Sequence, residues 1–107
     1  MENFKGKISV IIPAYNESDN ILNTLRETIK VFEKVGNSYE IVVVDDGSED
    51  DTSKEAKKAR ANNNYVKVIR CSETNRGKGF AIKSGFEHVN GDLVVFMDAD
   101  LDLHPEQ

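Results

Sequence analysis

The sequence is poor in the residues that mark several classes of protein. It has no tryptophan, two prolines, two histidines and one cysteine in 107 residues. The single Cys71 cannot form an internal disulfide, and no spacing joins it to His88 and His104 as a zinc site would require. Cys71 is therefore expected to be inert. Ser48 has no evident base partner, and the sequence shows no hydrolytic triad.

Long hydrophobic runs and excess positive charge are also missing. The longest apolar runs are five or six residues, whereas a membrane-spanning helix needs about 20. No charged segment followed by an apolar run opens the chain, so no secretory signal is expected. The net charge of −5 gives no general attraction for nucleic acid. We expect a cytoplasmic protein without a transmembrane segment.

The length and composition predict one globular domain. Hydrophobic residues make up 38% of the chain and charged residues 31%, which is typical of a protein with a modest core. The chain stops at Gln107, soon after its richest acidic cluster, and Pro105 suits the first turn of a helix that does not follow. We therefore predict that residues 1–107 are part of a longer protein; a short natural chain is the alternative.

Hydrophobic patterning predicts strands that alternate with helices. Apolar, β-branched runs predict buried strands at residues 7–12 and 40–44, and an alternating pattern predicts a strand nearer an edge at 65–70. Leu93–Met97 are apolar throughout and predict a strand buried on both faces. The order βαβαβαβ favours an α/β fold with a parallel sheet.

Three helices are predicted between these strands. Ser18 is the expected N-cap of the first, and Thr52–Glu55 has the spacing of a capping box for the second. The second helix is polar and is expected at the periphery. The predicted buried faces are Ile21, Leu25, Ile29 and Phe32 in the first helix, Ala56 and Ala59 in the second, and Ala81, Ile82, Gly85, Phe86 and Val89 in the third.

Four polar loops follow the predicted strands, and parallel strands would bring them to one rim of the sheet. They are residues 13–17, 45–48, 75–79 and 98–102. Asp98 and Asp100 end a strand and suit a hard divalent cation, which usually needs one or two carboxylates plus phosphate oxygens and water. Taken alone, the two acids are equally consistent with a solvated strand end.

The other three loops offer groups for a nucleotide. Asp45 and Asp46 can accept hydrogen bonds from a base or a ribose, Tyr15 can stack on a base, and Glu17 can bind its edge or the sugar. Arg76 and Lys78 precede a helix whose N-terminal amides suit a diphosphate. Ordinary turns and helix starts are the alternative for each loop. Together the loops predict a site for a nucleoside diphosphate and its metal, which points to group transfer from an activated donor.

In series these motifs resemble family 2 glycosyltransferases. The motifs are Ile11-Ile12-Pro13-Ala14-Tyr15-Asn16-Glu17, Val43-Val44-Asp45-Asp46-Gly47-Ser48 with Asp51-Thr52, Asn75-Arg76-Gly77-Lys78-Gly79 and Met97-Asp98-Ala99-Asp100. They occur in the family's order and cover almost the whole chain. The third loop and the acidic ending are most similar to the polyprenyl-phosphate branch, which includes dolichyl-phosphate mannose and glucose synthases.

The resemblance implies a three-layer α/β/α, Rossmann-like GT-A fold with a mainly parallel sheet, here truncated. It implies a UDP- or GDP-sugar donor, Mg²⁺ or Mn²⁺, inversion at the sugar carbon, and polyprenyl phosphate or a glycan as acceptor. Pro13, Tyr15, Glu17 and Asp46 or Asp45 would hold the nucleoside, while Asp98 and Asp100 would bind diphosphate and metal as the catalytic pair. Asp102 stands where mannose synthases often have Gln and is a third candidate metal ligand.

Several expectations follow for the isolated chain. The family's acceptor-binding half would lie beyond residue 107, so we expect a donor-binding part that is inactive, or nearly so, by itself. Its parent could be membrane-associated, and exposed apolar surface could give a homo-oligomer. The alternatives are a non-catalytic nucleotide-binding or assembly module and, less favoured, a receiver-type signalling domain. In a receiver the acid pair would follow the first strand, whereas here it follows the second.

Overall fold

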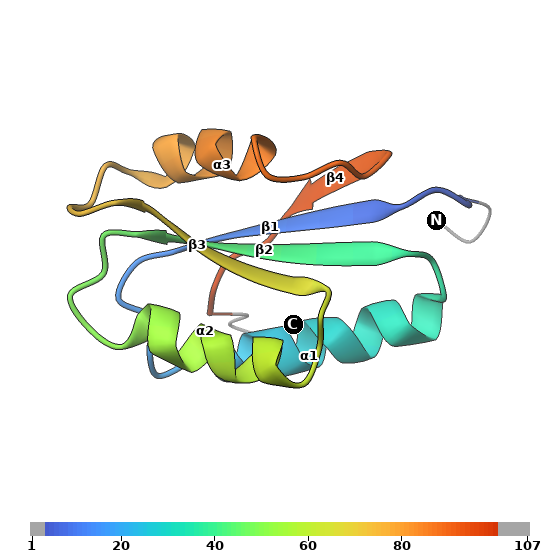
Figure 1. Ribbon diagram of the computed structural model, residues 1–107, viewed down its shortest axis with the longest axis horizontal. Helices are drawn as coiled ribbons and strands as arrows, with labels where there is room; N and C mark the ends of the chain where they lie inside the picture. The colour runs from blue at the N-terminus through green and yellow to red at the C-terminus, as the bar shows by residue number, and fades with distance from the viewer. Residues whose placement is uncertain (1–3, 101–107) are drawn as a thin grey trace, which may run out of the picture.

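The computed structural model describes residues 4–100 and confirms the predicted order of elements. The elements are β1 (Ile8–Ala14), α1 (Ile21–Val35), β2 (Tyr39–Asp46), α2 (Thr52–Ala61), β3 (Val66–Ser72), α3 (Lys78–Phe86) and β4 (Leu93–Phe96). The strands form one four-stranded sheet in the order β3-β2-β1-β4, and every pairing is parallel. Helices α1 and α2 cover one face and α3 covers the other (Figure 1).

Alternate residues of the central strands supply the two layers of the core. On one face, Ile8, Val10 and Ile12 of β1 pack with the buried residues of α1 and α2, which include Leu25 and Ala56. On the other, Ile11 packs with Val42, Val44 and Ala81. Burying a side chain such as Leu25 contributes about 1.5–3 kcal/mol. The three-layer α/β/α architecture is therefore confirmed.

The helix starts differ from the sequence-based predictions. Helix α1 has Asn20 as its N-cap residue instead of Ser18, and Ser18 donates its backbone N–H to Asp50 in a neighbouring loop. Thr52 is the first residue of α2, after Asp51, so the predicted capping box does not form. Contacts between loops far apart in the sequence take up these polar groups, which a local pattern cannot anticipate.

Strand β4 is less buried than predicted. It lies at an edge of the described sheet, where only β1 pairs with it, and the side chain of Phe96 is 48% exposed. Phe86, expected on the buried face of α3, is 49% exposed, whereas Ala81 and Gly85 are buried. Two other predictions are confirmed: β3 is an edge strand, and α2 buries only Thr52, Ala56 and Ala59.

Strands β1 and β2 each extend two residues further than predicted, to Ala14 and Asp46. Pro13 is compatible with this extension because β1 pairs with β4 only as far as Ile11, so the N–H that proline lacks has no strand beside it on that side. Among residues 4–100, no helix combines the length and apolar character needed to cross a membrane.

Candidate functional site

The carboxyl ends of the strands surround a cavity of about 390 Å³. All four predicted loops reach it, as expected for a parallel sheet, so the predicted convergence is confirmed. The predicted site residues that line the cavity are Pro13, Tyr15, Glu17, Asp46, Lys78, Asp98 and Asp100. Asp45 and Arg76 are not among the lining residues, and Asp102 lies outside the described residues.

The loop after β1 is fastened to the loop after β2. Asn16 has a left-handed backbone with φ of 53°, and its N–H donates to Ser48 Oγ at 2.8 Å while its Oδ1 accepts from the N–H of Glu49 at 2.9 Å. The N–H of Glu17 donates to Thr52 Oγ1 at 2.9 Å. These bonds fix the backbone directly after Tyr15, a residue that is 37% exposed beside the cavity.

Asp50 completes this connection. Its carboxylate accepts hydrogen bonds from the N–H of Ser18 at 3.2 Å and from the N–H of Thr52 at 3.0 Å. Burial opposes ionisation of this group, but the bonds from Thr52 and Ser18 outweigh it and keep the pKa of Asp50 below its ordinary value. The ionised carboxylate therefore ties the start of α2 to the loop that carries Tyr15 and Glu17.

Asp45 has an internal role in the structure. Its side chain is fully buried and accepts hydrogen bonds from the N–H of Ser48 at 2.9 Å, from Ser53 Oγ at 2.5 Å and from Arg70 at 3.2 Å. These partners occupy both carboxylate oxygens. Asp45 thus stabilises the turn after β2, and of the two adjacent acids only Asp46 reaches the cavity.

Asp46 joins the turn after β2 to the glycine-rich loop. It is 3% exposed, and its carboxylate accepts the N–H groups of Arg76 at 3.0 Å and Gly77 at 2.7 Å. The thiol of Cys71 lies 3.6 Å from the same carboxylate. Burial first and the charge of Asp46 second raise the pKa of Cys71, so this thiol is held in its neutral form.

The two cationic side chains at the glycine-rich loop, Arg76 and Lys78, have different partners. The guanidinium of Arg76 lies 4.7 Å from the centre of the Phe80 ring, a cation–π contact. Lys78 is the first residue of α3, and its Nζ lies 2.7 Å from Asp98 Oδ1. Both members of this ion pair are well exposed, at 63% and 70%, so it is weak and easily exchanged for other partners.

The segment 97–100 is held by the layers on either side of it. The N–H of Met97 donates to the carbonyl of Ile11 at 3.0 Å, and the buried hydroxyl of Thr24 in α1 donates to the carbonyl of Ala99 at 2.6 Å. Asp98 and Asp100 flank the buried Ala99 and both line the cavity. The backbone between the two carboxylates is therefore fixed while the carboxylates themselves stay open to solvent.

This donor set fits a hard divalent cation that also takes oxygens from a ligand. Residues 4–100 contain no cluster of three His, Cys, Asp or Glu side chains able to enclose a metal. Two carboxylates suffice for Mg²⁺ or Mn²⁺ when phosphate oxygens and water complete the coordination. Asp98 and Asp100 could hold the metal in this way, with Lys78 beside them to bind a phosphate.

A second, larger hollow of about 550 Å³ lies at the opposite ends of the strands, beside Tyr39 and Tyr65. Its buried carboxylate, Glu40, already accepts hydrogen bonds from Ser9 at 2.6 Å and Lys67 at 3.2 Å. The two lysines that line this hollow, Lys7 and Lys67, both pair with Glu40, at 3.7 Å and 3.2 Å. We therefore place the site at the smaller cavity, because chemistry identifies a site better than volume does.

The sequence did not reveal four residues that hold the site in place: Thr24, Ser48, Asp50 and Thr52. Ser48 and Thr52 lay inside a recognised motif, but their contacts with the loop after β1 join residues more than 30 positions apart. Asp50 looked like one acid among several, and Thr24 like a neutral position of an amphipathic helix. No local signal distinguished them.

Comparison with known proteins agrees with this geometry. The model of the family described as glycosyl transferase family 2 matches residues 9–107. An undecaprenyl-phosphate 4-deoxy-4-formamido-L-arabinose transferase of Klebsiella pneumoniae is 41% identical over 102 residues, which are 94% of this chain and 31% of that protein. The chain thus spans about a third of the length of the curated relatives it matches.

Solved structures show the same fold. A mannosyltransferase from Pyrobaculum calidifontis, solved with GDP-Man and Mn²⁺, superposes with a TM-score of 0.75 at 26% identity, over 92% of this chain and 29% of that one. Glucosyl-3-phosphoglycerate synthase from Mycobacterium tuberculosis, solved with Mn²⁺, UDP and glucosyl-3-phosphoglycerate, gives 0.73 at 29% identity, over 88% and 33%. The fold is that of the GT-A nucleotide-sugar transferases, and the receiver alternative is not supported. The chain belongs to glycosyl transferase family 2.

Proposed function

We propose that this chain binds the nucleotide-sugar donor of an inverting glycosyltransferase whose acceptor is a polyprenyl phosphate. The observation that carries the proposal is the shared cavity, where an aromatic and acidic loop, a basic helix start and two carboxylates meet. The relatives support the chemical class, because one is named as an undecaprenyl-phosphate sugar transferase and two solved neighbours hold GDP-Man or UDP together with Mn²⁺.

Each part of the cavity has a role in donor binding. Tyr15 and Glu17 lie on the loop after β1, fixed for contact with the nucleoside, and Asp46 forms the wall between them and α3. The N-terminal amides of α3 and the ammonium of Lys78 suit the diphosphate. Asp98 and Asp100 would hold Mg²⁺ or Mn²⁺, which when bound neutralises the charge that develops on the leaving diphosphate.

Lys78 has two partners in this scheme. Without donor its ammonium balances the charge of Asp98 at 2.7 Å. With metal at the carboxylates, the same ammonium is free to turn toward a phosphate oxygen, because the exposed pair costs little to separate. This exchange keeps the charge of the site balanced in both states.

The chemical nature of the acceptor determines whether the enzyme needs a general base to activate it. A phosphate acceptor is already ionised at neutral pH and needs little help from a general base, whereas a sugar hydroxyl usually needs one. Within residues 4–100, the carboxylates that line the cavity are Glu17, Asp46, Asp98 and Asp100, and the proposal assigns the first two to the nucleoside side of the site and the last two to the metal. A phosphate acceptor is therefore the simpler match to the residues that the structure describes.

Titration calorimetry with UDP, GDP and their sugars, each with and without Mn²⁺, tests the donor site. We expect metal-dependent binding that Asp100→Asn abolishes. Asp19→Asn is the matched control, because it removes the same charge at an exposed position outside the cavity. If no nucleotide binds with or without metal, or if both variants lose binding equally, the donor site is wrong.

We further propose that these 107 residues bind donor without normal turnover, because they span only about a third of the length of the relatives. A transfer assay with nucleotide sugar and polyprenyl phosphate measures this directly. Normal turnover would contradict the proposal. Donor binding without any transfer would also be expected of a non-catalytic nucleotide-binding module. If transfer appears when a polypeptide that binds the acceptor is added, the enzyme is favoured over that module.

A further inference from the structure

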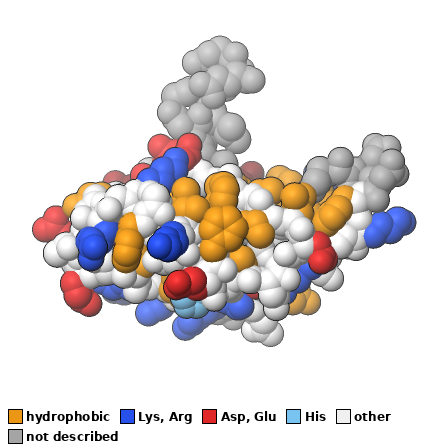
Figure 2. Space-filling view, turned by 90° about the horizontal axis from the view of Figure 1, so that it is seen from above, with side chains coloured by type: hydrophobic (Ala, Val, Ile, Leu, Met, Phe, Trp, Pro, Cys, Tyr) orange, Lys and Arg blue, Asp and Glu red, His pale blue; other side chains and the backbone are white. Residues whose placement is uncertain are grey.

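A buried polar pair lies on the α3 side of the sheet, at the end of the strands opposite the cavity. Ser9 of β1 and Glu40 of β2 are 0% and 4% exposed, and Ser9 Oγ donates to Glu40 Oε2 at 2.6 Å. Seen from the side of α3, packed side chains cover this face of the molecule (Figure 2). Neither residue lines the cavity, so donor binding as proposed gives the pair no role.

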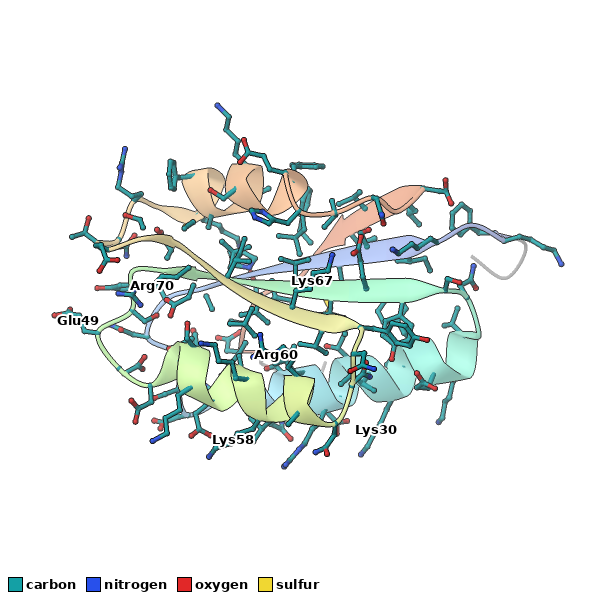
Figure 3. All side chains as sticks on the ribbon, viewed as in Figure 1. Lys30, Glu49, Lys58, Arg60, Lys67 and Arg70 are labelled. Atoms are coloured by element: carbon teal, nitrogen blue, oxygen red, sulfur yellow. The ribbon has the colours of Figure 1, made fainter. Side chains whose placement is uncertain are left out.

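This pair receives the turn between α3 and β4. Glu40 Oε2 accepts the N–H of Asn90 at 2.8 Å, and Ser9 Oγ accepts the N–H of Gly91 at 2.8 Å. Lys67 extends from β3 on the same side of the sheet (Figure 3), and its ammonium lies 3.2 Å from the other carboxylate oxygen, Oε1. Both oxygens of Glu40 are therefore occupied, and the charge of the buried carboxylate is balanced.

Gly91 fits over Ser9 because it has no side chain. A Cβ added at Gly91 would press against Ser9 Oγ and stand 2.8 Å from the backbone nitrogen of Ser9 and 3.1 Å from the carbonyl oxygen of Lys7. If β4 slipped by one residue along β1, Asn90 or Asp92 would take this place, and both carry side chains. The turn therefore accepts one alignment of β4 with β1.

The side chains of β4 themselves do little to select an alignment. Leu93–Phe96 are all apolar, so the alternation that usually sets the register of a strand is missing. The bonds just beyond the strand engage the N–H of Met97 and the carbonyl of Ala99, which are backbone groups that almost every residue carries. These bonds strengthen an alignment without selecting it, and selection falls to the turn at the start of β4.

We propose that Glu40 and Ser9 are positioning residues for the metal site: by fixing the register of β4, they set where Asp98 and Asp100 stand at the cavity. The proposal rests on the metal site proposed at these two carboxylates. Each residue of slip moves a strand by about 3.3 Å, whereas Mg²⁺ demands near-ideal octahedral geometry at about 2.0–2.1 Å. A slip of one residue would thus take the carboxylates away from a metal held by the donor phosphates.

Glu40→Leu tests the proposal, with Glu40→Gln and Val66→Ala as controls. Leucine removes the acceptor for the N–H of Asn90, whereas the amide oxygen of glutamine can still accept it. Val66 is 1% exposed in β3, two strands away from β4, so its truncation lowers stability without touching the turn. Circular dichroism verifies that each variant folds.

NMR measures the register through nuclear Overhauser effects, which in the unmodified chain should join Ser9 to Val94 and Val10 to Val95. These effects should weaken or move to other pairs in Glu40→Leu and persist in both controls. Calorimetry with UDP or GDP and Mn²⁺ measures the site itself. Glu40→Leu should raise the dissociation constant about 10–100-fold, the range typical of groups that orient metal ligands without touching the metal, and both controls should leave it nearly unchanged.

If Glu40→Leu does not fold, Ser9→Ala gives the same test with a smaller change, because it removes the oxygen that accepts the N–H of Gly91. Unchanged Overhauser effects between β1 and β4 overturn the proposal, and this readout needs no metal. Equal changes in Val66→Ala overturn it too, because loss of stability alone would then explain them.

The binding measurement separates this proposal from the proposed function. If the unmodified chain binds Mn²⁺ and nucleotide and the variant binds them equally well, only the positioning role is refuted. If the unmodified chain binds neither, the donor site is refuted and the positioning role at the metal falls with it.

Discussion

A side chain added at Gly47 should destabilise the fold strongly. Gly47 lies in the turn after β2 with φ of +75°, and a Cβ added there would stand 2.3 Å from the backbone carbon of Thr74 and 2.6 Å from its oxygen. Gly36, which follows α1, has a similar φ of +87°, but nothing lies within 4 Å of its Cβ position. Alanine substitutions at Gly36 and Gly47 can therefore be compared to separate two free-energy costs: that of a left-handed backbone, which both share, and that of the contact with Thr74, which only Gly47 makes.

The magnitude follows from these two terms. A non-glycine residue in the left-handed region costs about 1–2 kcal/mol, and both Gly36→Ala and Gly47→Ala incur this cost. Only Gly47→Ala adds overpacking against a neighbouring backbone, which typically costs about 1–3 kcal/mol more. We therefore expect losses of about 1–2 kcal/mol at Gly36 and about 2–5 kcal/mol at Gly47, a large part of the ~5–15 kcal/mol stability of a typical domain.

Urea unfolding followed by circular dichroism measures both losses. If the free energy of unfolding falls equally in the two variants, the close approach of the turn to Thr74 does not exist in solution and the reasoning is refuted. Donor binding offers an independent readout. Displacing the loop at Thr74 should weaken the bonds from Asp46 to the glycine-rich loop and hence nucleotide binding, whereas Gly36→Ala should leave binding unchanged.

Three further predictions concern single side chains. Asp50→Ala removes the acceptor shared by two loops, so hydrogen exchange at the amides of Ser18 and Thr52 should accelerate; unchanged exchange would show that these bonds do not persist. Burial tends to raise the pKa of Glu40, but bonds from Ser9, the Asn90 amide and Lys67 lower it below 4.5 overall. Ionised Glu40 therefore stabilises the folded state at pH values above its ordinary pKa, and this stabilisation is lost as the pH falls through its lower pKa in the folded protein. Glu40→Gln should remove part of this acid-induced loss of the free energy of unfolding. The same dependence of that free energy on pH in the variant and the unmodified chain would contradict the prediction. The raised pKa of Cys71 predicts slow alkylation at pH 8, which Asp46→Asn should accelerate by removing the nearby charge; equal rates would argue against the contact.

The sequence was sufficient to predict the order of elements and the loops that meet at the cavity. Apolar runs such as Ile41–Val44 and the repeat of Ile21 and Leu25 are local patterns whose periods identify strands and helices without knowledge of the partner. Alternation of strands and helices then restricts the sheet to parallel pairing, and parallel pairing brings the loops that carry Tyr15, Asp46 and Asp98 to one rim.

The tertiary structure decided which polar groups are used internally and which remain available. Asp45 and Asp46 are adjacent and chemically identical, yet one is fully enclosed by Ser48, Ser53 and Arg70 while the other reaches the cavity. Successive residues of a strand point to opposite faces, so their surroundings depend on what packs on each face. That information lies in segments tens of residues away.

Burial at the sheet edges was decided in the same way. Five consecutive apolar residues predicted a strand covered on both faces, but the burial of β4 depends on its neighbours, and within the described chain only β1 lies beside it. The sequence by itself therefore determined which residues can form a strand and where its acids emerge. Only the tertiary structure determined whether that strand is covered, because burial is a property of contacts between elements and not of a residue's own hydrophobicity.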